Sequence, residues 1–386
     1  MSTLQFRPTR AEIDAGAIRR NTQRLLAAAG DGAELCAVVK ADGYGHGIVT
    51  AANAALAGGA TWLAVALVEE GVVLREAGID APVLVLSEPP TAAAIAMVAH
   101  DLTPTVYRPE FVAALEDAAA ARGATVRVHV KLDTGMTRVG VAAEDRRAVL
   151  ELLAASGRLE VEGCQTHLAR ADEPDVTTTA EQLERFAAAL ADVAGAGLTP
   201  RLVHVANTAG TLLHTDAWRA VLAAEAPGAV PLVRAGIGLY GLDAGPSVAA
   251  LAHGLEPALR LVSEVSHVRR ISAGTPVSYG HRWSAPADGW LATVPVGYAD
   301  GVPRVLTGRL EILHRGTRRP VVGTVTMDQV LVWCGDDVPA VGDEIVLIGA
   351  AGTDRIGMEE WAEGVDTITY EIATGISARV PRVVVG

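Results

Sequence analysis

The chain contains little cysteine: its 386 residues include three, Cys36, Cys164 and Cys334. Each lies inside an apolar run, and no two have the C-x-x-C spacing of a zinc or redox motif. We therefore expect neither a disulfide framework nor a metal site. The three thiols are interpreted as core residues of a protein in a reducing compartment.

Positive charge is also in short supply. The sequence has 32 basic residues against 45 acidic ones, which gives a formal net charge of -13 at pH 7. A chain of this sign repels nucleic acid and anionic membrane surfaces, so neither is expected as a general partner. A small anionic ligand held by a few local groups is compatible with this balance.

We expect neither a targeting leader nor a membrane span. The first residues mix charges from the start, without the basic, apolar and small-residue order of a signal peptide. Residues 47–68 are uncharged over 22 positions, but Asn53 and the Gly58, Gly59 pair divide them into a helix, a turn and a strand. We expect a cytoplasmic protein.

Apolar, strand-like runs alternate with helical segments through the first two thirds of the chain. The runs span residues 35–39, 62–66, 82–86, 102–106, 126–132, 159–167, 202–206 and 232–234. Eight strands in about 240 residues favour a closed (β/α)8 barrel over an open sheet, which rarely needs so many. The expected fold class is α/β, with this barrel over residues 11–246.

Two helices of the barrel can be placed from the sequence. The first covers residues 14–29, with Ile18 and Leu25 near one face. The second begins with Thr178 and Glu181 in capping-box spacing, followed by an apolar face that contains Phe186.

A change of pattern predicts a second, smaller domain. Residues 246–257 carry proline, glycine and polar side chains, which is typical of a boundary. Beyond them, short strand-like runs with turn residues between them cover 259–271, 290–296, 310–313, 321–334 and 344–348, with one short helix near 358–363. We expect a β-rich domain formed by residues 1–10 and 247–386.

Polar side chains stand where the predicted barrel strands end, which is where the active sites of such barrels lie. They are Lys40 after the first strand, Lys131, Asp133 and Arg138 at or after the fifth, His167 at the end of the sixth, Asn207 and Thr208 after the seventh, and Arg234 at the end of the eighth. Individually they have plainer interpretations: Asp133 can simply start a turn, and His129 and His204 are expected to be core or wall residues. Five such coincidences together indicate one shared site.

The stretch AVVKADGYGHG, residues 37–47, contains the central candidate. Lys40 stands where a buried strand ends and closely spaced glycines begin, and Tyr44 adds a hydroxyl four residues later. A lysine whose pKa is lowered by desolvation or neighbouring charge can condense with a carbonyl group. The plainer interpretation, a surface lysine before a loop, is the commoner meaning of such a stretch in isolation.

A phosphate site is predicted across the barrel mouth from Lys40. In this fold it commonly forms from the loops after the seventh and eighth strands, where Thr208 and the amides of Gly236 and Ile237 stand. An aldehyde that carries a phosphate would satisfy both the lysine and this site. Pyridoxal 5'-phosphate is such a molecule.

The chain resembles bacterial alanine racemases, which are fold-type III pyridoxal-phosphate enzymes, nearly from end to end. The matching segments are AVVKADGYGHG, KLDTGMTRVG, THLARAD, VHVANTAG and VRAGIGLYG in the barrel, and VSYGHRW, PVGYADG, GTVTMDQ, TITYEI and RVPR in the second domain. The resemblance implies an alanine racemase that works as a homodimer, supplies D-alanine for peptidoglycan and closes each site with the partner's second domain.

The resemblance also implies roles for individual residues. Lys40 would hold the cofactor and act as one base, and Tyr279 of the partner subunit would be the other. The phosphate would be bound by Tyr44, Thr208, Gly236, Ile237 and Tyr370, near Asn207. Arg234 would face the pyridine nitrogen and His167 would link it to Tyr279, while Arg138 and Met327 would meet the substrate carboxylate, Tyr298 and Asp328 would line the entrance, and Lys131 would be carbamylated.

These roles make chemical sense for racemisation. Removing a proton from one face of Cα and returning it to the other is simplest with two bases on opposite sides. Lysine and tyrosine both start near pKa 10, so neighbouring cations such as Arg138 are needed near neutrality. An arginine at the pyridine nitrogen leaves that nitrogen unprotonated and weakens the electron sink, which limits side reactions.

Four positions depart from the usual pattern of that family. Asp42 and Gly43 stand where asparagine and alanine are common, Thr208 where serine is common, and Thr326 where cysteine often precedes Met327. Thr208 keeps a hydroxyl for the phosphate, whereas Asp42 and Thr326 could change the electrostatics of the pocket.

Other functions are weighed against an alanine racemase. A racemase of serine or of broad specificity would use the same residues. A non-catalytic pyridoxal-phosphate barrel protein would usually lack the second domain and leave Tyr279, Met327 and Tyr370 without a purpose. A decarboxylase of the same fold type is disfavoured, because it would need an acid in place of Arg234.

Overall fold

The eight predicted strands form a closed parallel barrel in the computed structural model, which describes residues 6–245, 248 and 254–386. Neighbours in sequence are neighbours in the barrel, and the first strand closes it by pairing with the last, Cys36 beside Arg234. The strands are β2 (Glu34–Val38), β3 (Trp62–Val65), β4 (Val83–Val85), β5 (Thr103–Val106), β6 (Val126–Lys131), β7 (Leu159–Gln165), β8 (Leu202–His204) and β9 (Val230–Ala235). The prediction of a (β/α)8 barrel is confirmed.

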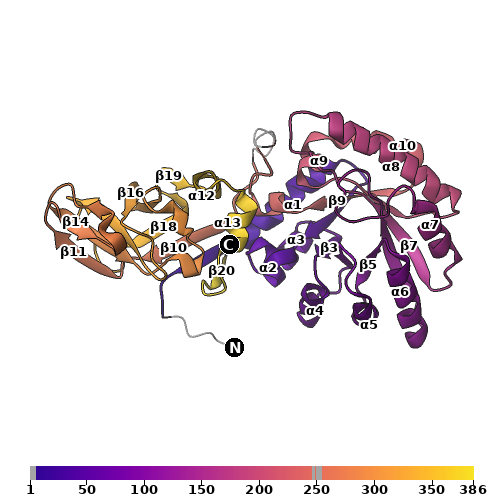
Figure 1. The fold of residues 1–386 in the computed structure, drawn as a ribbon, viewed down its shortest axis with the longest axis horizontal. Helices are drawn as coiled ribbons and strands as arrows, with labels where there is room; N and C mark the ends of the chain where they lie inside the picture. The colour runs from indigo at the N-terminus through magenta and orange to yellow at the C-terminus, as the bar shows by residue number, and fades with distance from the viewer. Residues whose placement is uncertain (1–5, 246–247, 249–253) are drawn as a thin grey trace. The chain divides into compact units, whose positions relative to one another are not determined.

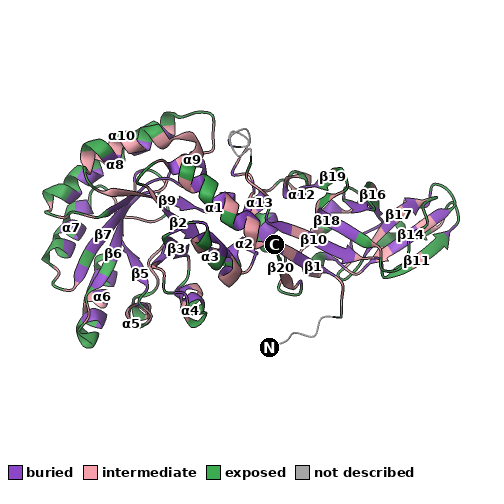
Figure 2. Ribbon diagram, turned by 180° about the vertical axis from the view of Figure 1, so that it is seen from behind, coloured by how far each residue is buried: buried purple, intermediate pink, exposed green. Residues whose placement is uncertain are grey.

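Helices surround this barrel, with buried faces toward the strands and exposed faces outside (Figures 1 and 2). They are α1 (Ala15–Ala29), α2 (Lys40–Tyr44), α3 (Ile48–Ala57), α4 (Val68–Glu76), α5 (Ala94–Ala99), α6 (Pro109–Arg122), α7 (Arg146–Ala155), α8 (Thr177–Gly195), α9 (Thr208–Leu213) and α10 (Thr215–Glu225), with the 3-10 turns η1 (Thr91–Ala93) and η2 (Ile237–Tyr240). The predicted apolar faces are buried, Ile18 and Leu25 in α1 and Phe186 in α8.

The predicted start of α8 is wrong in detail. The helix begins at Thr177, so Thr178 lies inside its first turn, and its N-cap is Val176, whose side chain cannot accept a hydrogen bond. The Asp175 carboxylate instead accepts the Thr177 amide at 3.0 Å. A carboxylate just before a helix satisfies its free amides and favours its positive end, so Asp175 replaces the capping box.

The uncharged segment 47–68 divides as predicted. Helix α3 and strand β3 occupy it, with the turn at Gly58 and Gly59 between them. Within the described residues, no helix combines the length and the apolar character that crossing a membrane requires.

The second unit is a β-rich domain built on one ten-stranded sheet. Its main path runs β11-β14-β17-β16-β15-β18-β10-β1-β20, and β19 pairs with β18. The strands are β1 (Arg10–Asp14), β10 (Leu259–Glu264), β11 (His267–Ile271), β14 (Gly289–Val294), β15 (Glu311–His314), β16 (Thr317–Val322), β17 (Val330–Gly335), β18 (Glu344–Ala351), β19 (Asp354–Ile356) and β20 (Arg382–Val385). This confirms the predicted β-rich domain.

Several smaller elements complete this unit. They are a separate two-stranded sheet of β12 (Pro276–Val277) and β13 (Trp283–Ser284), the helices α12 (Met358–Val365) and α13 (Thr369–Gly375), and the 3-10 turns η3 (Tyr279–His281), η4 (Tyr298–Asp300) and η5 (Arg304–Leu306). The predicted short helix corresponds to α12, whereas α13 was not predicted.

The chain crosses between the two units at positions that differ from the predicted boundaries. One unit comprises 16–43 and 48–256, and the other comprises the segment up to Ala15, residues 44–47 and the chain from Pro257 onward. Strand β1 joins the β-rich unit because it pairs antiparallel with β10 and parallel with β20. Of the predicted linker, residues 246, 247 and 249–253 lie outside the described part of the chain.

Candidate active site

The backbone that follows Lys40 forms a left-handed turn. Ala41 has φ 52° and ψ 51°, Asp42 has 52° and 48°, and Gly43 has 61° and 43°. Tyr44 continues the turn with φ 51°. Left-handed helical conformation costs about 1–2 kcal/mol for each residue with a side chain, so three of these four positions are strained and other contacts must offset that cost.

A carboxylate from the next βα unit holds the start of this turn. Glu70 of α4 accepts the Ala41 amide at 2.6 Å across 29 positions of sequence. Its other oxygen accepts the amides of Ala66 and Leu67 at 2.9 and 3.1 Å, at the end of β3. One ionised side chain thus ties the residue after Lys40 to the neighbouring strand end, and hydrogen bonds to charged groups are each worth about 1.5–3 kcal/mol.

Lys40 and Lys131 are the two lysines of the whole chain, against 30 arginines. Burial, then the Arg138 charge, lowers the pKa of Lys40, while Glu70 opposes this shift. Burial, then the charges of Arg234 and Arg138, lowers the pKa of Lys131 to about 8. Both amines therefore lie among the cations predicted to share the site, and both lose a proton more readily than a lysine in water.

Arg234 is buried at the end of β9 and its two terminal nitrogens are fully engaged. One donates to His204 Nδ1 and to the His204 carbonyl, both at 3.0 Å. The other donates to the carbonyls of Thr166 and Val205 at 2.6 and 3.1 Å and to His167 Nδ1 at 3.2 Å. Among the described residues, these bonds leave the Nε–H of Arg234 as its donor for a ligand.

The guanidinium determines how the neighbouring histidines are protonated. Arginine can only donate, so the Nδ1 atoms of His167 and His204 must be acceptors, and each neutral ring carries its proton on Nε2. Burial, then the Arg234 charge, lowers the pKa of His167 to about 3. Burial lowers the pKa of Arg234 to about 10, so it stays charged at neutral pH. His167 is therefore a neutral donor through Nε2.

The hydrogen bonds between histidines continue into the barrel core. His204 Nε2 donates to His129 Nδ1 at 2.9 Å, so His129 turns its own Nε2–H toward Glu162 Oε2, 4.0 Å away. His204 is a satisfied core residue, as predicted. His129 is buried as predicted, but its Nε2 has no hydrogen-bond partner among the described residues.

The predicted phosphate position is a close-fitting cradle. Thr208 begins α9, and its hydroxyl accepts the amides of Gly236 and Gly238 at 3.2 and 3.3 Å. A Cβ on Gly238 would lie 2.6 Å from Thr208 Cγ2, so no side chain fits there. Asn207 caps α9 by accepting the Gly210 amide at 2.8 Å. Backbone that must approach this closely at a helix start is suited to a phosphate group.

The loop that carries Arg138 is shaped by Asp133. Its carboxylate accepts the amides of Gly135 and Thr137, both at 3.0 Å. Asp133 therefore builds a turn, which is the plainer of its two interpretations. Arg138 itself is exposed.

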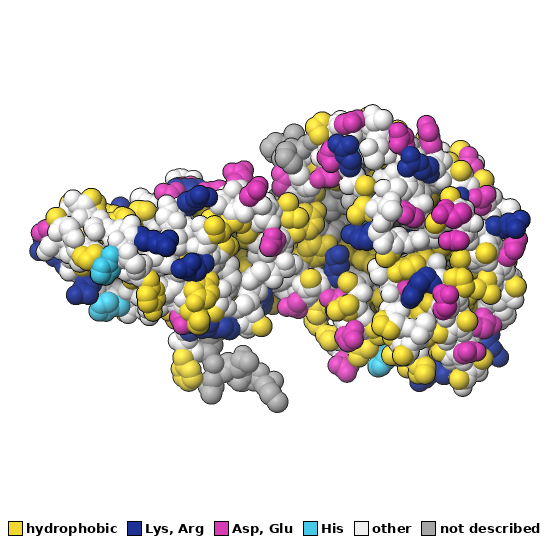
Figure 3. All heavy atoms as spheres, in the orientation of Figure 1, with side chains coloured by type: hydrophobic (Ala, Val, Ile, Leu, Met, Phe, Trp, Pro, Cys, Tyr) yellow, Lys and Arg dark blue, Asp and Glu magenta, His cyan; other side chains and the backbone are white. Residues whose placement is uncertain are grey.

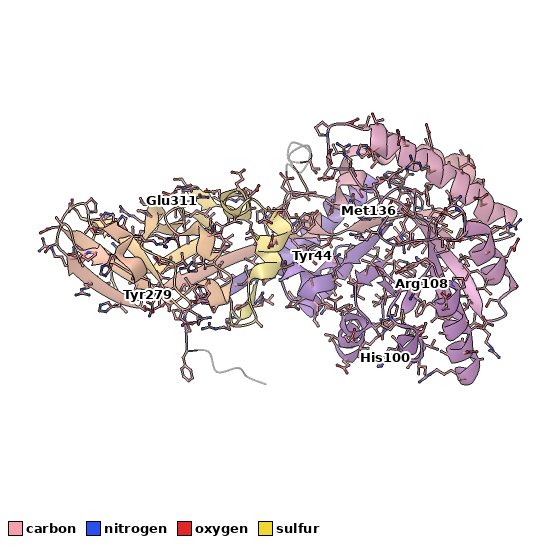
Figure 4. The ribbon with its side chains drawn as sticks, in the orientation of Figure 1. Tyr44, His100, Arg108, Met136, Tyr279 and Glu311 are labelled. Carbon is pink, nitrogen blue, oxygen red and sulfur yellow. The ribbon has the colours of Figure 1, made fainter. Side chains whose placement is uncertain are left out.

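The remaining predicted residues lie in the β-rich unit. The side chain of Tyr279 is 75% exposed at the tip between β12 and β13 (Figure 4). Tyr298 and Met327 lie on adjoining loops, joined where the Tyr298 amide donates to the Thr326 carbonyl at 3.0 Å. Asp328 is exposed and pairs with Arg379 at 2.7 Å.

Tyr44 and Tyr370 meet within this unit as well. Their ring centroids are 6.0 Å apart. Burial raises the pKa of Tyr44 to about 12, so its hydroxyl remains a donor at neutral pH.

Comparisons with known proteins cover both units. The family profile "Alanine racemase, N-terminal domain" matches residues 13–244, and "Alanine racemase, C-terminal domain" matches residues 258–384. An alanine racemase of Symbiobacterium thermophilum is 46% identical over 378 residues, or 98% of this chain and 97% of the relative. The chain belongs to the alanine racemase family.

Solved structures of the family have the same fold. Alanine racemase from D-cycloserine producing Streptomyces lavendulae matches with a TM-score of 0.91 at 36% identity, over 99% of this chain and 98% of that one. A histidine racemase from Leuconostoc mesenteroides matches with a TM-score of 0.89 at 28% identity, over 99% of each chain.

The structure accounts for the departures from the usual alanine racemase pattern. Asp42 accepts the Ile48 amide at the start of α3 at 2.8 Å and adopts a left-handed conformation that aspartate and asparagine both tolerate. The Thr326 hydroxyl donates to the Gln329 carbonyl at 2.7 Å and closes the loop around Met327. Thr208 supplies the hydroxyl that organises the cradle. These side chains have structural roles within their loops.

Sequence reasoning missed several residues that support the site. Glu70, Glu162 and Arg379 act through contacts with residues distant in sequence, which no local pattern reveals. One signal was available in the composition. Because the chain has two lysines, their position at the ends of two barrel strands was itself informative.

Proposed function

We propose that the protein is an alanine racemase that uses pyridoxal 5'-phosphate and interconverts L- and D-alanine with two bases. Lys40 is the first base, and Tyr279 of the partner subunit is the second. The observation that carries the proposal is the convergence of both lysines with Arg138 and Arg234 at the carboxyl ends of the barrel strands. Membership of the family supports the same conclusion.

The residues present fit the cofactor. Lys40 would bond the aldehyde carbon, and the Nε–H of Arg234 would donate to the pyridine nitrogen. The phosphate would be held by Tyr44, Thr208, Gly236, Ile237 and Tyr370, with Asn207 shaping the cradle. When bound, the cofactor supplies an electron-withdrawing ring that stabilises negative charge at Cα.

Arg234 would set how strongly that ring withdraws electrons. Its pKa of about 10 keeps it charged at neutral pH, and five hydrogen bonds fix its orientation. A guanidinium donates without handing over its proton, so the pyridine nitrogen would stay unprotonated. A limited charge at Cα favours return of the proton over side reactions.

The two bases would exchange protons with opposite faces of Cα. Burial and Arg138 lower the pKa of Lys40, which makes its neutral amine available to accept the proton. The phenol of Tyr279 would deliver a proton to the other face, and its phenolate would remove one from that face. His167, a neutral donor through Nε2, would orient that phenol.

The substrate carboxylate would be bound by Arg138 and the Met327 amide, with Tyr298 and Asp328 at the entrance. Lys131 would carry a carbamate. A lysine whose pKa is about 8 has enough neutral amine near pH 7.5 to add carbon dioxide, which forms an N–C bond and releases one proton. The anion so formed would lie between Arg138 and Arg234 and hold the substrate-binding arginine.

Exposure of Tyr279 supports a homodimer. Excluding water from an active site prevents proton leakage, yet within its own chain this phenol is 75% exposed. If a second copy of the chain covered this phenol, the dimer would have two equivalent active sites. We expect the dimer to work in the cytoplasm and to supply D-alanine for peptidoglycan.

A broader specificity is the second candidate. A histidine racemase shares this fold at 28% identity, so the fold alone does not restrict the side chain of the substrate. Parallel assays with serine and histidine address this point. Alanine activity far below either of them would favour the alternative.

The test is racemisation of each alanine enantiomer by the wild type, Lys40→Ala and Tyr279→Phe. We expect loss of activity by about 10³-fold or more in each variant, because each lacks one of two proton-transfer groups. Full activity in Tyr279→Phe would refute the second base.

Covalent attachment is measured separately. Borohydride reduction of the holoenzyme followed by peptide mass spectrometry should place the cofactor on Lys40. Lys131 is the internal control, since it is the chain's other lysine. Label on Lys131 alone would overturn the assignment of Lys40.

A further inference from the structure

The hairpin that carries Tyr279 is strained on both sides of that residue. Ser278 has φ 63° and ψ -174°, a region of backbone conformation that is populated essentially by glycine. Gly280 and His281 follow with φ 74° and 46°. Such a conformation costs on the order of 1–3 kcal/mol and persists where the surroundings enforce it.

Two hydroxyl groups enforce it here. The Ser278 hydroxyl donates to the Thr324 carbonyl at 2.9 Å, and the Thr324 hydroxyl donates to the Tyr279 carbonyl at 2.8 Å. Thr324 is 5% exposed, so this pair of hydrogen bonds is partly shielded from water. The two segments touch closely, because a Cβ on Gly323 would lie 2.6 Å from Ser278 Cβ.

Among the described residues of the β-rich unit, no hydrogen bond holds the phenol group of Tyr279 itself. The ring stands at an open pocket of about 410 Å³ lined by Ser278, Tyr279, Gly280, His281, Thr326, Gln329 and Leu331. The sheet below it, β12 and β13, consists of two residues per strand. The direction of the phenol therefore depends on the backbone, and the backbone depends on the two hydroxyl groups.

We propose that Ser278 and Thr324 are positioning residues that aim Tyr279 at the reacting carbon. The inference rests on the proposed function, since it assumes that Tyr279 is the second base. Proton transfer is sensitive to placement, and an error of about 1 Å in a catalytic group can cost about 100-fold in rate.

The kinetics of racemisation distinguish a misplaced Tyr279 phenol from a general loss of folding stability. The two enantiomers have equal free energies, so the equilibrium constant is one and kcat/KM must fall equally in both directions. The α-deuterium isotope effect need not change equally. Misplacing Tyr279 slows its own proton transfer, so the isotope effect should rise in the direction in which Tyr279 removes the proton.

The primary variant is Thr324→Val, which keeps the shape and removes the hydroxyl. We expect kcat/KM to fall about 10–100-fold, with an isotope effect that rises in the direction in which Tyr279 removes the proton and does not rise in the other. Thr324→Ser should recover most of the activity. Ser266→Ala is the matched control, because it removes a serine hydroxyl bonded to a backbone carbonyl, that of Thr293, elsewhere in the unit.

Ser278 gives an independent test, because two substitutions at this position should differ in activity. Ser278→Gly removes the hydroxyl and also the strain, whereas Ser278→Ala removes the hydroxyl and keeps the strain. We expect the glycine variant to be the more active of the two. This pair answers the question even if Thr324→Val fails to fold.

The outcomes separate this inference from the proposed function. Wild-type isotope effects in Thr324→Val, or equal rises in both directions, would overturn the positioning role. An alanine variant at position 278 that matches or exceeds the glycine variant would also overturn it. A fully active Tyr279→Phe enzyme would instead refute the second base itself.

Discussion

The turn after Lys40 and the turn around Tyr279 both contain unfavourable backbone conformations, and different kinds of hydrogen bond hold them in place. In both, the reactive residue is followed or flanked by residues with positive φ, a conformation that L residues avoid. The Lys40 turn is tied down by the ionised side chain of Glu70, inside a unit whose sheet is closed. The Tyr279 turn is tied by two neutral hydroxyl groups on a two-stranded hairpin.

The difference indicates what each turn needs from outside itself. Hydrogen bonds to a carboxylate contribute about 1.5–3 kcal/mol each, against about 0.5–1.5 kcal/mol for neutral ones. The start of the Lys40 turn is therefore held by a charged group of the barrel unit itself. Tyr279 is 75% exposed within its own chain, and this is the surface that the proposed second subunit would cover. On the face drawn in Figure 3, charges of both signs are interspersed, without one extended patch of either sign.

The largest expected effect concerns the rigidity of the chain just after the Lys40 turn. Gly45 has φ 79°, and a Cβ there would lie 2.3 Å from the Ala373 carbonyl oxygen. Gly45→Ala should lower the free energy of unfolding by about 3 kcal/mol or more, measured by denaturant titration. Gly78→Ala is the control, since Gly78 has φ 77° and nothing within 4 Å. It should cost about 1 kcal/mol, and equal costs would show that conformation alone decides.

Glu70→Ala should lower kcat/KM about 100-fold, because it frees the Ala41 amide and lets the strained turn relax. Glu69→Gln, an exposed neighbour on the same helix, is the control. A second readout is acylation of the apoenzyme as a function of pH. Glu70 raises the pKa of Lys40, so the variant should label Lys40 at lower pH, with Lys131 as internal reference. Unchanged kinetics and labelling would show that Glu70 does not hold the Lys40 turn in place.

The barrel should also be the unit whose folding stability falls more in acid. Burial lowers the pKa values of His129 and His167 to about 3 and that of His204 well below its usual value. The folded state then binds fewer protons than the unfolded state below pH 6.5, so stability falls as pH falls from 6.5 toward 3. Each histidine contributes up to about 1.4 kcal/mol per pH unit. His129→Asn should flatten the pH dependence of the unfolding midpoint. An unchanged slope would contradict the interpretation of these histidines as buried and neutral.

The smallest expected effect separates two neighbouring threonines. Thr326 bonds the Gln329 carbonyl, whereas Thr324 bonds the Tyr279 carbonyl. Thr326→Val should cost about 1 kcal/mol of stability and lower kcat/KM about two- to threefold, measured beside Thr324→Val. Equal losses of activity in the two variants would show that the loop as a whole matters more than the hydroxyl that faces Tyr279.

The barrel was predictable because its strands are buried on both faces. Runs such as 35–39 and 62–66 are continuously apolar, and polar side chains such as Lys40 stand where a run stops. The placement of β1 was not predictable by the same means. Its five residues alternate between buried and partly exposed, and its partners β10 and β20 lie hundreds of residues away.

The residues of the candidate site likewise fall into two groups, those that a local sequence pattern marks and those that only the fold brings into contact. Residues that a strand end or a glycine-rich segment marks, such as Lys40, Thr208 and Arg234, were found from the sequence. Glu70 and Thr324 were not, because each acts on a backbone group 29 or 45 positions away. Left-handed backbone at Ala41 and Ser278 is likewise invisible in sequence, since neither residue favours it.

The central claim is that each site joins Lys40 of one chain to Tyr279 of another. Mixing inactive Lys40→Ala and Tyr279→Phe proteins, then allowing subunits to exchange, tests it directly. Random pairing makes half the dimers hybrid, and each hybrid has one site with both native residues, so about a quarter of the wild-type activity should return. Recovery to that level is the predicted result. No recovery after demonstrated exchange of subunits would contradict the account.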